Sequence, residues 1–124
     1  MAKHVVPGSG MEGLPISDAV RAGDFVFLSG LVGFGPDGTI VEGGIVSETD
    51  RIMADAADIL KRAKATLDDI VKVTVYLADA ADFAGFNEAY ARYFESAPPA
   101  RITVVASLTI AARIEMDFIA YTGG

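Results

Sequence analysis

The sequence predicts an α+β fold in which two amphipathic helices cover one face of a six-stranded sheet. Two observations carry this prediction. The chain of 124 residues is 52% hydrophobic, enough for a sizeable core, and the predicted elements follow the order β, β, β, α, β, α, β, β. Because two helices cover only one face of such a sheet, its other face must meet water or another subunit. We expect a single domain over residues 1–124.

The N-terminal third of the chain is predicted to hold three short strands and two loops. Gly23-Asp24 separates two strand-like runs and is a two-residue turn signal, so these runs are expected to form a hairpin. The loops are rich in Gly and Pro. The strands are expected at 4–6, 19–22 and 25–30, and the loops at 7–15 and 33–44.

Two helices are predicted from apolar residues spaced three and four apart. The first is expected to begin at Ser47, whose hydroxyl can cap free backbone N–H groups, and to end near Ala65. The second is expected over residues 81–94. Its predicted buried side consists of Phe83, Phe86, Asn87, Tyr90 and Phe94.

The remaining strands are predicted from alternating apolar and polar residues at 70–78, 102–108 and 112–121. In the first of these, Val71, Val73, Val75 and Leu77 share one face. In the last, Ile114, Met116, Phe118 and Ala120 alternate with Arg113, Glu115, Asp117 and Ile119.

Composition excludes several classes of function. A net charge of −7 with scattered Lys and Arg disfavours a nucleic-acid partner. The chain has no cysteine for a thiolate site, and its single histidine, His4, cannot form a metal cluster alone. There is no phosphate-binding loop, dinucleotide fingerprint, zinc-ligand spacing or nucleophile elbow. No apolar run approaches the roughly 18 residues of a membrane span. The N-terminus lacks the long apolar stretch of a signal peptide, and we expect a cytoplasmic location without a membrane partner.

Arg101 is the most informative candidate for a binding role. It follows Pro98-Pro99, which fix an extended approach to an apolar run. A guanidinium held on rigid backbone beside apolar residues suits bidentate capture of a carboxylate. The alternative is an edge-strand charge in a structural ion pair.

Three other polar residues stand in apolar settings. Asn87 lies on the apolar side of the second helix, Ser29 ends an apolar strand before Gly30, and Glu115 lies mid-strand. Each has a structural alternative: tying down a loop, forming a turn, and pairing across strands with Arg113 as a neighbour. Together they indicate a small anion site, with Arg101 for a carboxylate and Glu115 for proton transfer.

Nearly the whole chain, from about Leu14 to Ala120, resembles the Rid family, the reactive intermediate deaminases also called YjgF proteins. The order and spacing of six segments carry the resemblance. They are Ser17 to Asp24, Phe27 to Gly30, Val71 to Leu77, Phe86 to Tyr90, Pro99 to Arg101 and Ile114 to Met116.

The resemblance implies a chorismate-mutase-like fold with a mixed sheet. It also implies a homotrimer in which the open sheet faces form a central barrel, with active sites in the clefts between subunits. This assembly would cover the face that two helices leave open.

The resemblance further implies hydrolysis of 2-imino acids, or their 2-enamine tautomers, to 2-keto acids and ammonia without a cofactor. Arg101 would bind the substrate carboxylate and Glu115 would orient or activate water. The backbone of Thr103 would help to position substrate or water. The substrate-binding residues implied are Ser29, Gly30, Asn87, Thr103 and Ile16.

The chain departs from the stricter deaminase pattern at three places. Ile16 replaces a tyrosine, Thr103 replaces a cysteine, and Leu108-Thr109 replaces Leu-Pro. The first change makes one pocket wall more apolar, which indicates a broader subgroup and a bulkier or more apolar imino acid. Two alternatives are a deaminase or hydrolase acting on a specialised catabolic intermediate, and a non-catalytic protein that binds small carboxylates.

Overall fold

The computed structural model describes residues 3–7 and 13–124. The strands are β1 (His4–Val5), β2 (Ala19–Ala22), β3 (Phe25–Leu28), β4 (Ile70–Leu77), β5 (Ala100–Val105) and β6 (Ile114–Tyr121). The α-helices are α1 (Ile45–Arg62) and α2 (Phe83–Ala91), and short 3-10 turns at Leu67–Asp69 and Ala80–Asp82 precede β4 and α2. This is the predicted order of elements.

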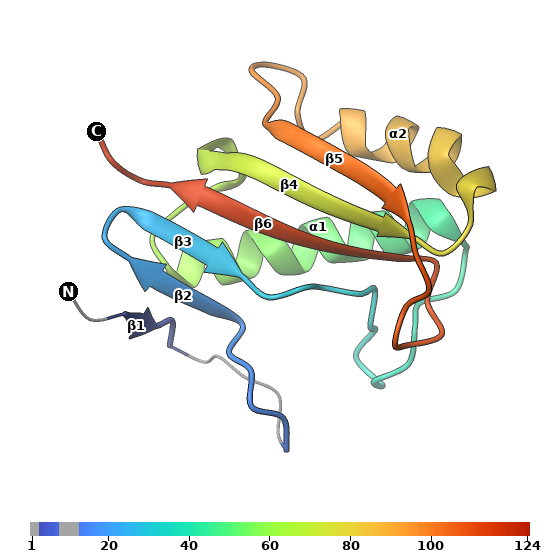
Figure 1. Ribbon diagram of the computed structural model, residues 1–124, viewed down its shortest axis with the longest axis horizontal. Coiled ribbons are helices and arrows are strands. Elements are labelled where there is room, and N and C mark those ends of the chain that lie inside the picture. Colours follow the sequence, from blue (N-terminus) through green and yellow to red (C-terminus); the bar gives the residue numbers. More distant parts are fainter. Residues whose placement is uncertain (1–2, 8–12) are drawn as a thin grey trace.

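The six strands form one sheet in the order β1-β2-β3-β6-β4-β5. Strands β4 and β5 run parallel and all other neighbours are antiparallel, so the sheet is mixed. Both α-helices lie on the same side of it (Figure 1). The predicted α+β architecture is confirmed, and β5 forms one exposed edge of the sheet.

The core lies between the helices and the sheet face they cover. Side chains alternate along a strand, and every second residue of β4 and β6 points at the helices. From α1, Ile52, Met53, Ala56 and Leu60 complete this core and are fully buried. The residues of the two central strands that join them are Val73, Val75, Leu77, Ile114, Met116, Phe118 and Ala120.

The opposite face of the sheet carries no helix and is largely apolar. The strand register places its large side chains on one surface, because paired residues of neighbouring strands share a face. Each of them is between 38% and 50% exposed. They are Phe25 and Phe27 from β3, Ile102 and Val104 from β5, and Tyr121 from β6, and we call this surface the open face.

The first helix begins two residues before Ser47, so the predicted Ser47 cap is wrong. Gly44 occupies the N-cap with a φ of 81°, and no side chain caps the helix. Gly43 and Gly44 both adopt positive φ, which glycine tolerates and which turns the chain into the helix earlier than the serine would. At the other end the helix stops at Arg62, and Lys64 takes the left-handed conformation of a common C-terminal cap.

The predictions for β4 and α2 also need correction. Val71 was expected on the buried face of β4, but a register irregularity between Ile70 and Lys72 turns it outward. Helix α2 is shorter than predicted, since it ends at Ala91. Phe83, expected on the buried side of α2, is 44% exposed at the first position of the helix.

Arg101 lies inside β5 rather than before it, because the strand begins at Ala100. The hairpin at Gly23-Asp24 is confirmed, with Gly23 at a φ of 61°. Part of the predicted loop at 7–15, residues 8–12, lies outside the described residues. Within the described residues, no helix is long and apolar enough to cross a membrane.

Candidate functional site

A cleft of about 290 Å³ opens where β2 begins, β3 ends and β6 begins. Four of the seven site residues expected from the sequence line it, namely Ile16, Ser29, Gly30 and Glu115. The rest of its wall is mostly apolar, from Leu14, Leu31, Val32, Phe34 and Ile110, with Ser17, Asp18, Asp55 and Thr109 between them. The cleft is therefore a mainly apolar pocket with a few polar groups, which is the usual character of a small-molecule site.

Ser29 and Gly30 shape the polar side of the cleft. The Ser29 hydroxyl donates to the carbonyl of Ser17 at 2.6 Å. The backbone N–H of Ser29 donates to the carbonyl of Asp18 at 2.9 Å. A Cβ placed on Gly30 would lie 2.1 Å from Oε2 of Glu115. Glycine is therefore needed at this position for Glu115 to keep its place beside the chain.

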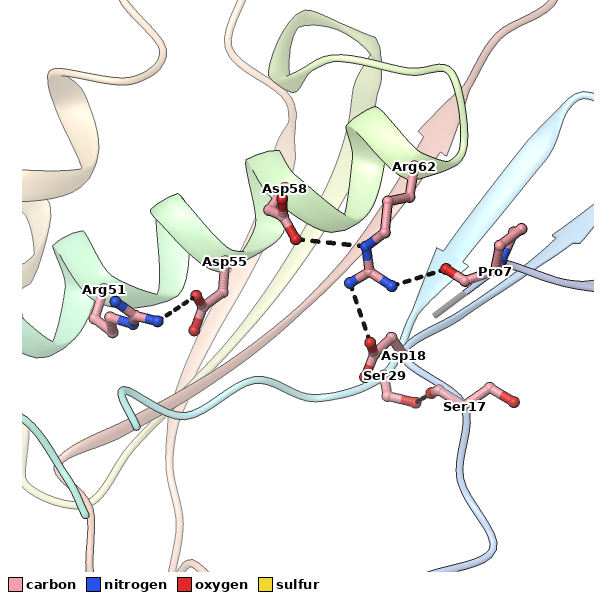
Figure 2. Close-up of polar contacts among 8 residues, drawn as sticks. All are labelled: Pro7, Ser17, Asp18, Ser29, Arg51, Asp55, Asp58 and Arg62. Atoms are coloured by element: carbon pink, nitrogen blue, oxygen red, sulfur yellow. Dashed lines mark hydrogen bonds and ion pairs between the residues drawn. The ribbon is translucent and has the colours of Figure 1, made fainter. Parts of the chain in front are cut away.

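Three carboxylates line the cleft, and two of them are neutralised by arginines. Figure 2 shows Arg62 reaching from α1 to Asp18, at 3.1 Å, and Arg51 pairing with Asp55 along the same helix, at 3.0 Å. Among the described residues, no cation forms an ion pair with Glu115. Glu115 is thus the carboxylate in this cleft that is left for a ligand or a water.

The surroundings of Glu115 favour its protonated form. Burial raises the pKa of its carboxyl above the usual 4.5, and the negative charge of Asp117 on the same strand raises that pKa further. A raised pKa makes the carboxylate a stronger base once it is ionised. This is the property required of a group that takes a proton from water.

Arg101 lies elsewhere, on β5, and its guanidinium is held by aromatic rings. Its Cζ is 4.8 Å from the ring centroid of Tyr90, 5.1 Å from that of Phe86 and 6.0 Å from that of Phe83. No described carboxylate pairs with it. The alternative of a structural ion pair is not realised within residues 3–7 and 13–124, and the cation remains available to an anionic ligand.

Two hydroxyls near Arg101 are buried without a hydrogen-bond partner in the described part of the chain. They belong to Thr103, two residues further along β5, and to Tyr90. Buried polar atoms normally find partners, so unpaired ones often mark a site that a ligand or water completes. Asn87, on α2, is half-buried, and its side chain forms no hydrogen bond to any described residue, so the predicted loop-tying role is not seen.

The sheet separates Arg101 from Glu115. Arg101 pairs in register with Val73, whose side chain is buried under the helices, whereas Glu115 pairs with Tyr76 on the other face. Because paired residues share a face, the two groups of one chain point to opposite sides of the sheet. Arg101, Asn87 and Thr103 accordingly do not line the cleft that holds Glu115.

The structural alternative for Glu115, an ion pair with Arg113 as a neighbour, does not form among the described residues. The Arg113 guanidinium instead lies 3.3 Å from Asp82 and 3.8 Å from the buried Glu48, and its backbone N–H donates to Glu48 at 2.9 Å. These contacts tie the start of β6 to α1 and to the turn before α2. Arg113 therefore has a structural role, and its guanidinium forms no ion pair with Glu115.

Sequence reasoning missed several residues of the cleft. Asp55 was hidden in the charged part of α1, and Leu14 and Ile110 lie in loops whose course no periodicity predicts. Thr109 also lines the cleft, so the departure from Leu-Pro falls on its wall.

The family model described as Endoribonuclease L-PSP matches residues 14–122. The chain belongs to this family. The match covers both α-helices and every strand except β1. The expected resemblance to reactive intermediate deaminases is confirmed, because a relative from Arabidopsis thaliana carries that name and one from Mus musculus is named a 2-iminobutanoate/2-iminopropanoate deaminase.

Relatives within the family span most of the chain. A RutC family protein of Pyrococcus abyssi is 45% identical over 109 residues, which are 86% of each protein. The 2-iminobutanoate/2-iminopropanoate deaminase of Mus musculus is 40% identical over 111 residues, which are 88% of this chain and 82% of that protein. The crystal structure of yeast Mmf1 superposes with a TM-score of 0.91 at 34% identity, covering 98% of this chain and all of that one.

Replacing Glu115 by Gln is expected to stabilise the folded protein at neutral pH. A carboxyl whose pKa is raised on folding binds its proton more tightly in the folded state, so its ionisation costs stability as the pH rises from 4.5 through the folded pKa. Urea unfolding at a series of pH values should show a gain for Glu115→Gln at pH 7 that shrinks as the pH falls through the folded pKa and is absent below pH 4.5. The exposed Glu88→Gln is the matched control. An equal change in both variants, or a loss in Glu115→Gln at neutral pH, would contradict the assigned surroundings of Glu115.

Proposed function

We propose that the protein hydrolyses 2-imino acids, or their 2-enamine tautomers, to 2-keto acids and ammonia, at sites formed between copies of the chain. The observation that carries the proposal is Arg101, a cation held on aromatic rings with no carboxylate partner among the described residues. A guanidinium in this state suits the carboxylate of a small acid. The relative from Mus musculus, named for its action on 2-imino acids, supports the choice of substrate.

In the proposed reaction, Arg101 binds the substrate carboxylate and fixes the C=N carbon near Glu115. The substrate reacts with its nitrogen protonated, as an iminium. The Glu115 carboxylate takes a proton from water while the water oxygen adds to the iminium carbon, and the C=N bond becomes a C–NH2 single bond. The Glu115 carboxyl then donates this proton to the amino nitrogen and the C–N bond breaks to release ammonia, while the aminol hydroxyl gives its proton to the Glu115 carboxylate as the keto C=O forms, and Glu115 passes that proton to solvent. Water is the only co-reactant, and no cofactor takes part.

Hydrolysis of an imine requires only a modest acceleration over the uncatalysed reaction. An imine carbon is already electrophilic, so orientation of the substrate and one general base are sufficient. A well-placed base typically contributes about 10²- to 10⁴-fold. Ser29, Gly30 and Ile16 form the wall beside Glu115, while Asn87 and the backbone of Thr103 accompany Arg101.

The placement of Arg101 and Glu115 on opposite faces supports an assembly in which one copy supplies each half of the site. The open face, with Phe25, Phe27 and Tyr121 exposed, offers an apolar surface that further copies would cover. A closed homotrimer satisfies both requirements, since each copy then presents its Arg101 to one neighbour and its cleft to the other.

The cleft wall supports a substrate with a larger apolar side chain. Ile16 and Leu14 are about half exposed at its mouth, and Ile110 is 39% exposed beside them. When exposed aliphatic side chains surround one cleft, an apolar ligand removes the most apolar surface from water and therefore binds most favourably. The substrate side chain would therefore be larger than those of 2-iminopropanoate and 2-iminobutanoate.

Keto-acid release is the direct test of the function. Imines generated in situ by an amino-acid oxidase, with semicarbazide trapping as the readout, should be hydrolysed faster than background by the wild type. Arg101→Ala should lose at least about 100-fold in kcat/KM, because the carboxylate clamp is gone. Arg92→Ala is the matched control, since Arg92 is a surface arginine paired with Asp50.

Glu115→Gln distinguishes an enzyme from a carboxylate-binding protein. An enzyme should lose turnover and keep binding of a 2-keto acid, whereas a binding protein would show no turnover in any variant. No acceleration of any imine by folded wild type would overturn the proposed reaction.

The apolar wall predicts an order among substrates. The imine derived from leucine should exceed that from alanine in kcat/KM by roughly tenfold or more, because each buried methylene is worth about 1 kcal/mol. Ile16→Ala should shrink that ratio while leaving the alanine-derived imine nearly unchanged. A preference for the smaller imine in the wild type would contradict the assignment of this wall to the substrate side chain.

A further inference from the structure

Arg101 is surrounded on the helix side by three rings of α2. Phe83, Phe86 and Tyr90 lie at helical spacings of three and four, so their side chains share one face of the helix. All three ring centroids lie within 6.0 Å of the Arg101 Cζ. This is the separation at which a cation is attracted to the face of an aromatic ring.

Phe83 is not explained by the hydrophobic core. Phe86 is fully buried and Tyr90 is 6% exposed, but Phe83 is 44% exposed at the start of the helix. Its ring takes part in no ring pair among the described residues, whereas Phe86, Tyr90 and Phe94 form a continuous series of tilted ring contacts. The Phe83 ring does, however, lie beside Arg101, whose Cζ is 6.0 Å from its centroid.

We propose that Phe83, together with Phe86 and Tyr90, positions Arg101 through cation–π contacts and thereby sets the affinity of the site for its carboxylate ligand. The inference rests on the proposed function, in which Arg101 binds that carboxylate. Phe83 is a positioning residue because it acts through Arg101 and not on the substrate.

The physical reason is that rings hold a guanidinium without neutralising it. A carboxylate partner would fix Arg101 equally well, but it would occupy the N–H groups and cancel the charge that the ligand needs. An aromatic ring has no oxygen acceptor and no net charge, so it leaves the guanidinium N–H donors and the positive charge for the ligand. A pre-oriented arginine also loses less side-chain entropy when the ligand binds.

Burial of the ring cluster agrees with this role. The Tyr90 hydroxyl is buried without a partner in the described chain, and burial raises its pKa while the charge of Arg101 opposes that rise. The same apolar surroundings weaken solvent screening of the guanidinium and strengthen its attraction for an anion.

The test is a series of three residues at position 83, because the strength of the cation–π contact falls from Trp to Phe and is absent for Leu. Phe83→Leu should raise KM about three- to fivefold with little change in kcat, and Phe83→Trp should keep or lower KM. Thermal midpoints should stay close to wild type, because the side chain is largely outside the core. A purely structural role would instead follow hydrophobic size and would change kcat and stability together.

Calorimetry with non-reacting ligands isolates the carboxylate. Binding of 2-oxobutanoate should weaken by the same factor in Phe83→Leu and be retained in Phe83→Trp. Binding of the neutral 2-oxobutanamide should not respond to position 83. Equal affinities of the wild type, Phe83→Leu and Phe83→Trp for 2-oxobutanoate would overturn the inference. So would an equal loss of affinity for the neutral amide in Phe83→Leu.

Arg101→Ala separates this inference from the proposed function. Loss of turnover and of 2-oxobutanoate binding in Arg101→Ala, together with no effect of Phe83→Leu, would overturn the role of Phe83 and leave the proposed function standing. Unchanged turnover and binding in Arg101→Ala would overturn both.

Discussion

The alternation of side chains across the sheet determines how this protein can form a site. In the parallel ladder of β4 and β5, Arg101 shares the face of Val73, which the helices bury. In the antiparallel ladder of β4 and β6, Glu115 shares the opposite face with Tyr76. Only a one-residue slip of register would bring the two groups to the same side, and it would expose the core. The packing of the core therefore fixes the separation of the cation from the base.

The charges around the site follow a second rule. Structural arginines are paired, as Arg62 is with Asp18 and Arg113 with Asp82, and these pairs hold α1 and the turn before α2 against the sheet. Arg101 and Glu115 have no such partner among the described residues. Each is instead surrounded by apolar or like-charged groups, which leaves a cation without an ion pair on one face and a carboxyl of raised pKa on the other.

The sequence predicted the architecture well and the site in part. Alternation and helical spacing are local patterns, so the element order and the covered face could be predicted from them. The start of α1 was missed because two glycines with positive φ outweighed the serine cap, and Val71 was misplaced because a bulge leaves no clear sequence signal. The ring cluster beneath Arg101 depends on how α2 packs against β5, which no local pattern specifies.

The measurement that tests the account most directly is complementation between two variants that the proposed function expects to be inactive. Arg101→Ala and Glu115→Gln chains, unfolded together and refolded as a mixture, should regain about one quarter of wild-type activity, because random assembly places an intact Arg101 beside an intact Glu115 of another copy in one site out of four. Each variant refolded alone should stay inactive. Recovery of activity would show that the two halves come from different copies. A mixture as inactive as either variant, with mixed assemblies demonstrated, would contradict the shared site.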